Sequence, residues 1–350
     1  MKPTSALATG LVAMEIQEPT SLPVRFQPGW HNVWEASLYK KACRKTLTDG
    51  WMFRRFGGDV PLAPRKTELR DSIDAFTDTC ERALQTRAAQ KRLRQRGAKN
   101  AMIFFDSWGE TSLFEDIDNW RDSMFVDILP KKILWDFKIQ AFSGKLRGER
   151  TGFLLALDMA QDCLHSGVAD NVVICGQHRH FPVMSLSETE RWPRRKPSPQ
   201  RGTNALFAVE RNLCMLVTKC EETLPSLSVG PRQILPTAHR AAAERLSEYW
   251  RDAGGEHIFS CAPPAPALLD INRRAAAAFA HHVPLYHQYG DSGSLNPALG
   301  IYHWFTAEAA RTPALISSLH PDQRLWLVNC LPAAALHQDT IDLREKNTSL

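Results

Sequence analysis

Three side chains in the C-terminal part of the chain have the types that nucleophilic catalysis uses. Cys261 carries a thiol, His287 an imidazole and Asp291 a carboxylate. A thiol attacks well once a base has removed its proton, and a carboxylate can orient that base. These three residues could therefore form a Cys–His–Asp catalytic site.

The remaining histidines and the cysteines give weaker indications of chemistry. His178 and His180 lie close together, but their spacing in the sequence supplies no third ligand for a metal ion. His281 and His282 suit packing or helix-capping roles. The eight cysteines are scattered, and no pair has the C-x-x-C spacing of a zinc site. We therefore expect most of them to be buried as small apolar residues, and we predict no metal site.

The elements that would position these residues alternate between helices and strands. Apolar residues at helical spacing, or in long apolar runs, predict helices over residues 69–86, 152–166, 239–253, 267–281 and 297–310. Short apolar runs predict buried strands over residues 101–105, 172–175, 206–210, 257–261 and 324–328. Such alternation predicts an α/β fold with helices on the faces of its sheet, one half formed by residues 1–211 and the other by 212–350.

The composition is that of a globular protein, since 43% of the 350 residues are hydrophobic. No run of about 18 apolar residues occurs, so we expect no membrane span. The first residues lack the long apolar core of a secretory signal, which favours a cytoplasmic location. Basic residues cluster over 87–99 and 194–196, as on a solvated surface or a dock for an acidic protein. No nucleic-acid-binding motif accompanies them, so we expect no nucleic-acid partner.

Four segments, in order along the chain, resemble those of one enzyme family. They are Trp51–Gly57, Arg150–Phe153 with the helix and strand that follow, Gly202–Glu210 and Tyr289–Asn296. Together they are similar to motifs of the β-ketoacyl-[acyl-carrier-protein] synthase III (KAS III) enzymes of the thiolase superfamily. The resemblance extends over roughly residues 45–330. It implies a thiolase-like fold, with two pseudo-duplicated βαβαβ halves in a five-layered α-β-α-β-α arrangement.

The resemblance also implies roles for individual residues. It places Trp51 and Arg55 where the family clamps the adenine end of coenzyme A, an indole against the base and a guanidinium against a phosphate. It places Arg150 at the position of the nucleophilic cysteine and Asp291 at that of the catalytic asparagine. Cys261 falls at the position of the catalytic histidine. The family's Cys-His-Asn triad is therefore substituted at every position.

These substitutions oppose the decarboxylative Claisen condensation that such enzymes perform. Arg150 stays protonated in proteins and cannot act as a nucleophile. An ionised Asp291 would repel an enolate instead of stabilising it. Pro332, in the segment that replaces the family's glycine-rich lid, has no N–H to offer an oxyanion. We predict that Arg150 and Asp291 instead pair with each other and fill the former cavity.

Two functions remain compatible with these observations. One is an acyltransferase-type enzyme of fatty-acid, polyketide-like or specialised-metabolite biosynthesis, with Cys261, His287 or Asp291 as base. Its substrate would be a coenzyme A or phosphopantetheine thioester, and it would hold no permanently bound cofactor. The other is a non-catalytic partner subunit of a heterodimeric condensing enzyme. The resemblance implies a homodimer or a heterodimer, and an acyl carrier protein as the acidic partner.

Overall fold

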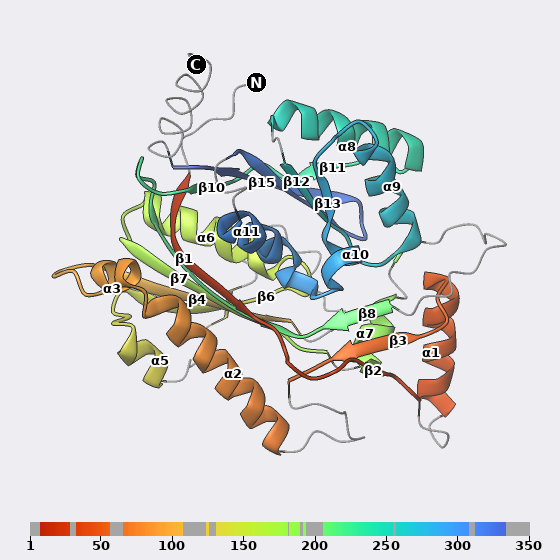
Figure 1. Cartoon of the computed structure of the whole chain (residues 1–350), viewed down its shortest axis with the longest axis horizontal. Helices are drawn as coiled ribbons and strands as arrows, with labels where there is room; N and C mark the ends of the chain where they lie inside the picture. Colours follow the sequence, from red (N-terminus) through yellow and green to blue (C-terminus); the bar gives the residue numbers. More distant parts are fainter. Residues whose placement is uncertain are drawn as a thin grey trace, which may run out of the picture.

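The structure, a computed structural model, describes most of the chain (Figure 1). The described residues are 8–28, 33–56, 66–107, 124–125, 131–180, 182–189, 192–193, 206–254, 257–307 and 312–333. Among these residues, none of the helices combines the length and the apolar character that crossing a bilayer requires.

A mixed sheet forms the centre of the first half. Its strands, in the order β6-β4-β7-β9-β1, are β6 (Phe142–Arg147), β4 (Asn100–Ser107), β7 (Asn171–His178), β9 (Arg211–Lys219) and β1 (Thr9–Gln17). The short β5 (Met124–Phe125) pairs with the outer edge of β6. β4 runs parallel to β6 and β7, whereas β9 runs antiparallel to β7 and β1. Almost every residue of β4 and β7 is buried, which explains their continuous apolar sequences.

The second half repeats this arrangement. Its strands, in the order β13-β12-β14-β15-β10, are β13 (His282–Pro284), β12 (His257–Cys261), β14 (Ala314–Leu319), β15 (Arg324–Leu331) and β10 (Ser226–Val229). The strand directions match those of the first half, and β11 (Gln233–Ile234) adds a short pairing to β15. β1 pairs with β10, so the two sheets meet edge to edge. The repeated order and directions confirm the two pseudo-duplicated halves.

Helices form three layers around the two sheets (Figure 1). The helices α6 (Gly152–His165) and α11 (Asn296–Thr306) lie between the sheets, and α2 (Lys66–Leu84), α3 (Arg87–Leu93) and α5 (Lys131–Asp136) lie beyond the first sheet. The outer face of the second sheet carries α8 (His239–Ala253) and α9 (Pro266–Ala276). α6 is buried along almost its whole length, whereas α8 buries a single stripe of residues. These are the five layers of a thiolase-like fold.

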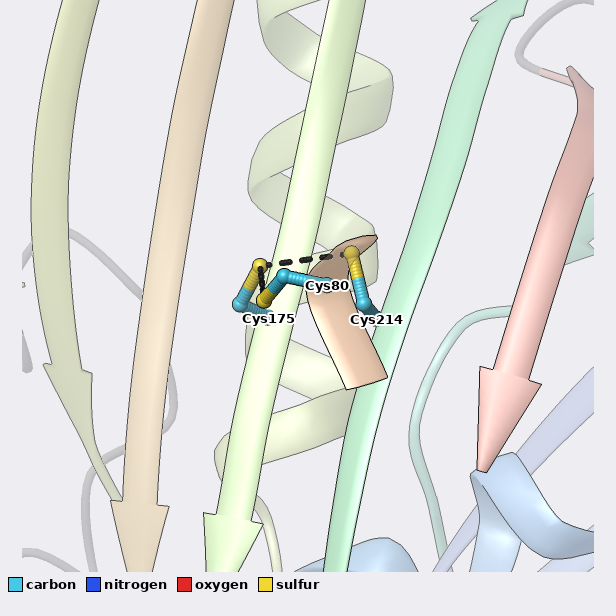
Figure 2. Close-up of side chains that lie close together, drawn as sticks. All are labelled: Cys80, Cys175 and Cys214. Atoms are coloured by element: carbon cyan, nitrogen blue, oxygen red, sulfur yellow. Dashed lines mark hydrogen bonds between the residues drawn. The ribbon is translucent and has the colours of Figure 1, made fainter. Parts of the chain in front are cut away.

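The helix α2 packs against the first sheet over the strands β9 and β1, and its Cys80 reaches Cys175 of β7. At this contact the side chains of Cys80, Cys175 and Cys214 gather on one face of the sheet (Figure 2). Cys175 and Cys214 are directly opposite each other on the two antiparallel strands. Residues far apart in the sequence thus meet in the core of the first half.

A smaller three-stranded sheet lies beside the main one. It consists of β2 (Val24–Arg25), β3 (Trp51–Arg54) and β8 (Leu206–Val209), with α1 (Val33–Thr46) and α7 (Pro182–Glu188) packed nearby. The last short elements, α10 (Leu285–Tyr289) and a 3-10 turn η4 (Gly293–Leu295), precede α11. This small sheet carries Trp51 and borders the candidate site.

The first half ends one strand later in the sequence than the strand predicted over residues 206–210. The predicted strand over 206–210 exists as β8, but it belongs to the small sheet and does not close the first half. β9 closes it, and the predicted boundary between residues 211 and 212 falls inside that strand. The sequence analysis did not predict β9, although residues 213–217 form a short apolar run of the kind from which other strands were predicted.

Candidate functional site

The candidate site lies where strand ends and helix starts of both halves converge. Ser107 ends β4, His178 ends β7 and Cys261 ends β12, while Arg150 precedes α6 and Asp291 lies in the loop before α11. Parallel strands collect their carboxyl ends at one edge of a sheet, and α/β proteins place their sites there. The fold therefore brings these five positions to one region.

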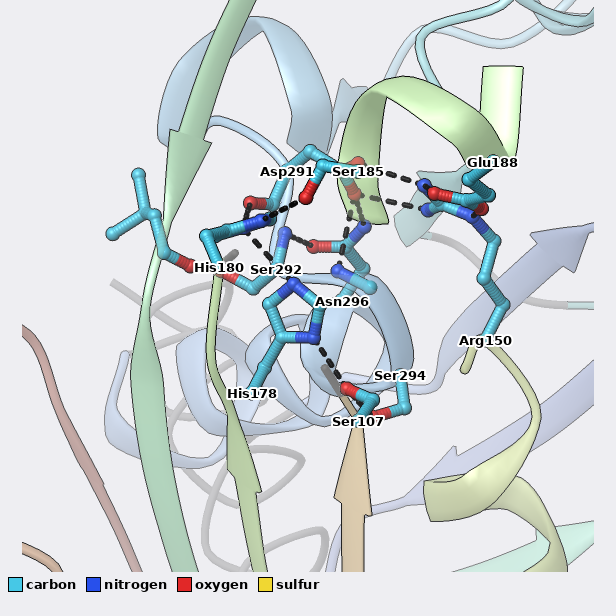
Figure 3. Close-up of polar contacts among 12 residues, drawn as sticks. Ser107, Arg150, His178, His180, Ser185, Glu188, Asp291, Ser292, Ser294 and Asn296 are labelled. Carbon is cyan, nitrogen blue, oxygen red and sulfur yellow. Dashed lines mark hydrogen bonds and ion pairs between the residues drawn. The ribbon is translucent and has the colours of Figure 1, made fainter. Parts of the chain in front are cut away.

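The predicted ion pair between Arg150 and Asp291 is present (Figure 3). Arg150 Nη1 donates to Asp291 Oδ1 at 3.0 Å, and Nη2 donates to Oδ2 at 2.8 Å. Both side chains are buried, with exposed fractions of 7% and 6%. This bidentate geometry is the strongest arrangement that a guanidinium and a carboxylate can adopt. The sequence prediction that the two residues face each other is confirmed.

A second carboxylate, Glu188 of α7, binds the other side of the guanidinium. Arg150 donates through Nε to Glu188 Oε1 and through Nη2 to Oε2, the latter at 3.0 Å. Burial would lower the pKa of Arg150, but the charges of Asp291 and Glu188 outweigh it and raise the pKa well above the usual value. Arg150 is therefore a permanent cation enclosed by two anions. Sequence reasoning missed Glu188, because nothing in the spacing of α7 links it to residue 150.

The carboxylate of Asp291 accepts hydrogen bonds on both oxygens. Besides the two bonds from Arg150, Oδ1 accepts from Asn296 Nδ2 at 2.7 Å and from the Gly293 backbone N–H at 3.1 Å. Burial alone would raise the pKa of Asp291, but the Arg150 charge and hydrogen bonds hold it well below its usual value. A carboxylate stabilised in this way is a poor proton acceptor, so Asp291 is unsuited to act as a base.

The loop that carries Asp291 is fixed to the small sheet by its backbone. The Asp291 N–H donates to the Phe207 carbonyl, and the Val209 N–H donates to the Asp291 carbonyl, both at 2.8 Å. Gly290 has φ +79°, and a Cβ there would lie 2.9 Å from the Phe207 carbonyl oxygen. Only glycine fits this combination of left-handed backbone and close approach. The loop thus orients the carboxylate toward Arg150.

A buried histidine pair lies beside the ion pair (Figure 3). His180 Nε2 is 3.2 Å from the Asp291 carbonyl oxygen and 2.9 Å from His178 Nε2. Because a carbonyl only accepts, His180 Nε2 carries a proton, and this single N–H is shared between the Asp291 carbonyl oxygen and His178 Nε2, which both accept. His178 Nδ1 then donates to Ser107 Oγ, and His180 Nδ1 accepts from Ser185 Oγ at 3.1 Å. The chain of hydrogen bonds assigns one neutral tautomer to each ring.

Burial keeps both imidazoles neutral. It lowers the pKa of His178 well below the usual value and that of His180 to about 4. The metal role considered for this pair has no support among the described residues, where neither histidine belongs to a cluster of potential ligands. The sequence did contain a sign of a core role, because both histidines closely follow the apolar run 172–175 of β7.

The predicted Cys–His–Asp arrangement is not assembled. Cys261 is buried at the end of β12, and burial together with the negative charge of Asp291 raises the pKa of its thiol. His287 is exposed on α10, where its ring contacts Tyr286. No hydrogen bond among the described residues joins Cys261, His287 and Asp291. α10 directs His287 outward and β12 places Cys261 in the core, so a shared catalytic role for these residues stays a prediction.

Neither residue of the predicted adenine clamp presents an open surface. Trp51 is 2% exposed and packs against Phe53 and Trp192, with ring centroids 6.2 and 6.3 Å apart. Arg55 is 5% exposed, and its Nε donates to Glu210 Oε1 at 3.2 Å. A nucleotide could reach them only after this packing opened, so their contact with coenzyme A stays a prediction.

A cleft of about 460 Å³ opens over the second half, and neither Arg150 nor Asp291 lines it. His287 lines it together with His282, whose Nε2 lies 2.8 Å from Ser260 Oγ and whose ring stacks on Trp250. Through these contacts His282 has the packing role that was predicted for it. Further lining residues are Leu269, Asn272, Pro284 and Tyr286.

Comparison with known proteins identifies the fold class. No protein-family model matches the sequence, and no curated protein matches it. Solved structures of OleA from Xanthomonas campestris are similar in fold. For one OleA variant the TM-score is 0.57 at 10% sequence identity, covering 93% of this chain and 99% of that one. A cerulenin-bound OleA gives a TM-score of 0.53 at 8% identity, covering 93% and 96%.

The chain is therefore a thiolase-like α/β protein, as its duplicated five-layered architecture already indicated. An identity of about 10% establishes the shared fold and leaves the activity to be argued from the site. That site contains an arginine enclosed by two carboxylates.

Proposed function

We propose that this chain is a non-catalytic thiolase-fold subunit of acyl-thioester metabolism, the partner of a condensing enzyme. The observation that carries the proposal is the position of the Arg150 guanidinium, which binds both Asp291 and Glu188 in the interior. A condensing site needs a nucleophile and neutral donors aimed at an oxyanion. Here a cation and two anions occupy that region and satisfy one another.

The energetics of the ion pair favour a structural role over a catalytic one. A buried charge is tolerated only when its partners remain in place, and breaking such a pair costs about 3–5 kcal/mol. A catalytic cycle that used Asp291 as base would have to protonate this carboxylate. The positive charge of Arg150 would then be balanced by Glu188 alone. The arrangement therefore resists the proton transfers that acyl transfer or condensation requires.

The acyltransferase alternative receives no comparable support. It needs Cys261, His287 or Asp291 as base, but Cys261 is buried with a raised pKa and His287 is exposed on another element. Asp291 is held by four hydrogen bonds, from Arg150, Gly293 and Asn296. These residues lack the mutual contacts through which a nucleophile and its base cooperate.

Two exposed tryptophans support a role in protein association. Trp34 on α1 and Trp135 on α5 are 63% and 79% exposed. Tryptophan is enriched at protein–protein interfaces, where its large ring is covered by the partner. Trp34 lies beside the small sheet and Trp135 beyond the first sheet, so a second thiolase-fold subunit could cover one of these two surfaces.

Intact-mass measurement tests the absence of an acyl-enzyme. The purified chain is incubated with acyl-coenzyme A, and adducts are mapped by peptide analysis. We expect acylation at most on Cys220, the exposed cysteine, and none in the Cys220→Ser variant. An acyl group on Cys261 would overturn the proposal, because it would reveal a working nucleophile.

The proposed partner role is tested by whether the chain forms a complex with a condensing enzyme. The chain is produced alone and together with an intact thiolase-fold synthase from the same source, and masses are measured by light scattering. We expect a heteromeric complex whose condensation rate exceeds that of the synthase alone. A stable homodimer that turns over acyl thioesters by itself would contradict the proposal.

A further inference from the structure

The cysteine cluster between α2 and the first sheet has the geometry of a metal site. The Sγ atom of Cys175 lies 3.6 Å from that of Cys80 and 3.6 Å from that of Cys214. All three sulfurs lie within 4.8 Å of one another (Figure 2). A point equidistant from them in their plane is no more than about 2.4 Å from each, and metal–thiolate bonds are about 2.3 Å long. An ion could therefore bind all three sulfurs with little rearrangement.

We propose that Cys80, Cys175 and Cys214 bind one soft metal ion, copper(I). The donor set consists of sulfur alone, which selects soft cations over magnesium, calcium or manganese. Structural zinc sites almost always complete four protein ligands, and no further His, Cys, Asp or Glu atom of the described residues joins the group. Copper(I) accepts three thiolates without a fourth ligand. The proposal is independent of the role of Arg150.

The surroundings of the cluster are apolar. All three cysteines are buried, and the side chains packed in the same core cluster include Phe76, Leu84 and Phe104. A cysteine that binds as thiolate releases its proton to solvent, so the affinity for the ion should rise with pH.

The ion would connect three elements of the first half. Cys80 comes from α2, Cys175 from β7 and Cys214 from β9, so one ion would cross-link a helix to two strands. Ligands that bind only the folded state stabilise it in proportion to their affinity. We therefore expect copper(I) to raise the melting temperature of the protein by several degrees.

The test is an anaerobic copper(I) titration against a chromogenic copper(I) chelator, in the Cys220→Ser background to remove the exposed thiol. We expect the chain to withdraw one equivalent, and Cys175→Ala to weaken binding at least about 100-fold. Cys330→Ala, which removes a buried cysteine outside the cluster, should leave the affinity unchanged. Cys214→Ala replaces Cys175→Ala if circular dichroism shows that the latter is unfolded.

Copper content after expression in copper-supplemented medium provides a second loading route, because the site is closed in the folded chain. Copper retained by the parent and by Cys330→Ala, but lost from Cys175→Ala, would support the site. Failure of the parent to take up copper by either route would overturn the proposal. Equal uptake by the parent and Cys175→Ala would overturn it as well and identify the cluster as apolar packing.

Discussion

The Arg150 guanidinium and the Asp291 carboxylate meet at 3.0 and 2.8 Å, and this contact joins the two halves of the molecule. Arg150 lies two residues before the central helix of the first half, and Asp291 lies in the loop before the central helix of the second. The ion pair therefore links the beginnings of the helices that share the middle layer. Glu188 completes the compensation of the positive charge.

Removing Arg150 should destabilise the protein strongly. In Arg150→Ala, Asp291 and Glu188 lose their cation while Asp291 stays buried, so we expect a loss of about 3–5 kcal/mol in the free energy of unfolding. The double variant Arg150→Met with Asp291→Leu, which removes both charges, should lose less than Arg150→Ala. Urea unfolding monitored by circular dichroism measures both. A loss below about 1 kcal/mol in Arg150→Ala would show that the pair is energetically unimportant.

Acidification from pH 7 to pH 5 should destabilise the fold through the histidine pair. The pKa of His180 is about 4 in the folded state and about 6.5 in an unfolded chain, so the unfolded state binds more protons across this interval. Stability is therefore retained above pH 6.5 and lost as the pH falls toward 4, by about 2 kcal/mol at pH 5. His180→Gln should show a shallower pH dependence in urea unfolding. The exposed His287→Gln serves as control and should follow the parent curve.

Replacing Gly290 by alanine should disturb the loop that orients Asp291. Gly290 and Gly97 have nearly equal φ values of +79° and +78°, but only Gly290 lies against other atoms. Gly97→Ala should cost about 1 kcal/mol from backbone strain, and Gly290→Ala about 1–3 kcal/mol more from the contact with Phe207. Thermal unfolding compares the two variants. Equal losses would indicate that the loop adapts without cost.

Thiol labelling should distinguish the exposed Cys220 from Cys261, the cysteine considered as a nucleophile. Cys220 is exposed and Cys261 is buried with a raised pKa, so a maleimide should modify Cys220 first in the folded protein. Cys261 should react only when the chain is unfolded with urea. Peptide mass mapping follows each site. Modification of Cys261 at the rate of Cys220 would show that it is accessible and ionised.

Much of the architecture could be predicted from local patterns. The run 152–166 is apolar through most of its length and forms the buried α6, and residues 239–253 have the amphipathic pattern of α8. The approach of Arg150 and Asp291 was predicted from a resemblance, because two residues so far apart in sequence carry no local sign of contact. β9 and β14 were missed, although residues 213–217 and 314–316 are apolar runs like those from which the other buried strands were predicted.

The side-chain environment of the site was less predictable. Glu188 and His178 reach the site through tertiary packing. Their separations from Arg150 along the sequence match no helical or strand repeat that could have indicated a contact. His287 was assigned to the site because it is close to Asp291 in sequence, but α10 turns it outward. The cysteine cluster likewise combines Cys80 and Cys175, which are separated by 95 positions.

The most direct test of whether the site is catalytically inactive measures the release of free coenzyme A from acyl- and malonyl-coenzyme A. The purified chain, in the Cys220→Ser background, is compared with variants that also carry Cys261→Ala, His287→Ala or Asp291→Asn. We predict that the parent releases coenzyme A at the uncatalysed rate and that none of these changes alters it. Turnover by the parent that falls on changing any one of these residues would contradict the account.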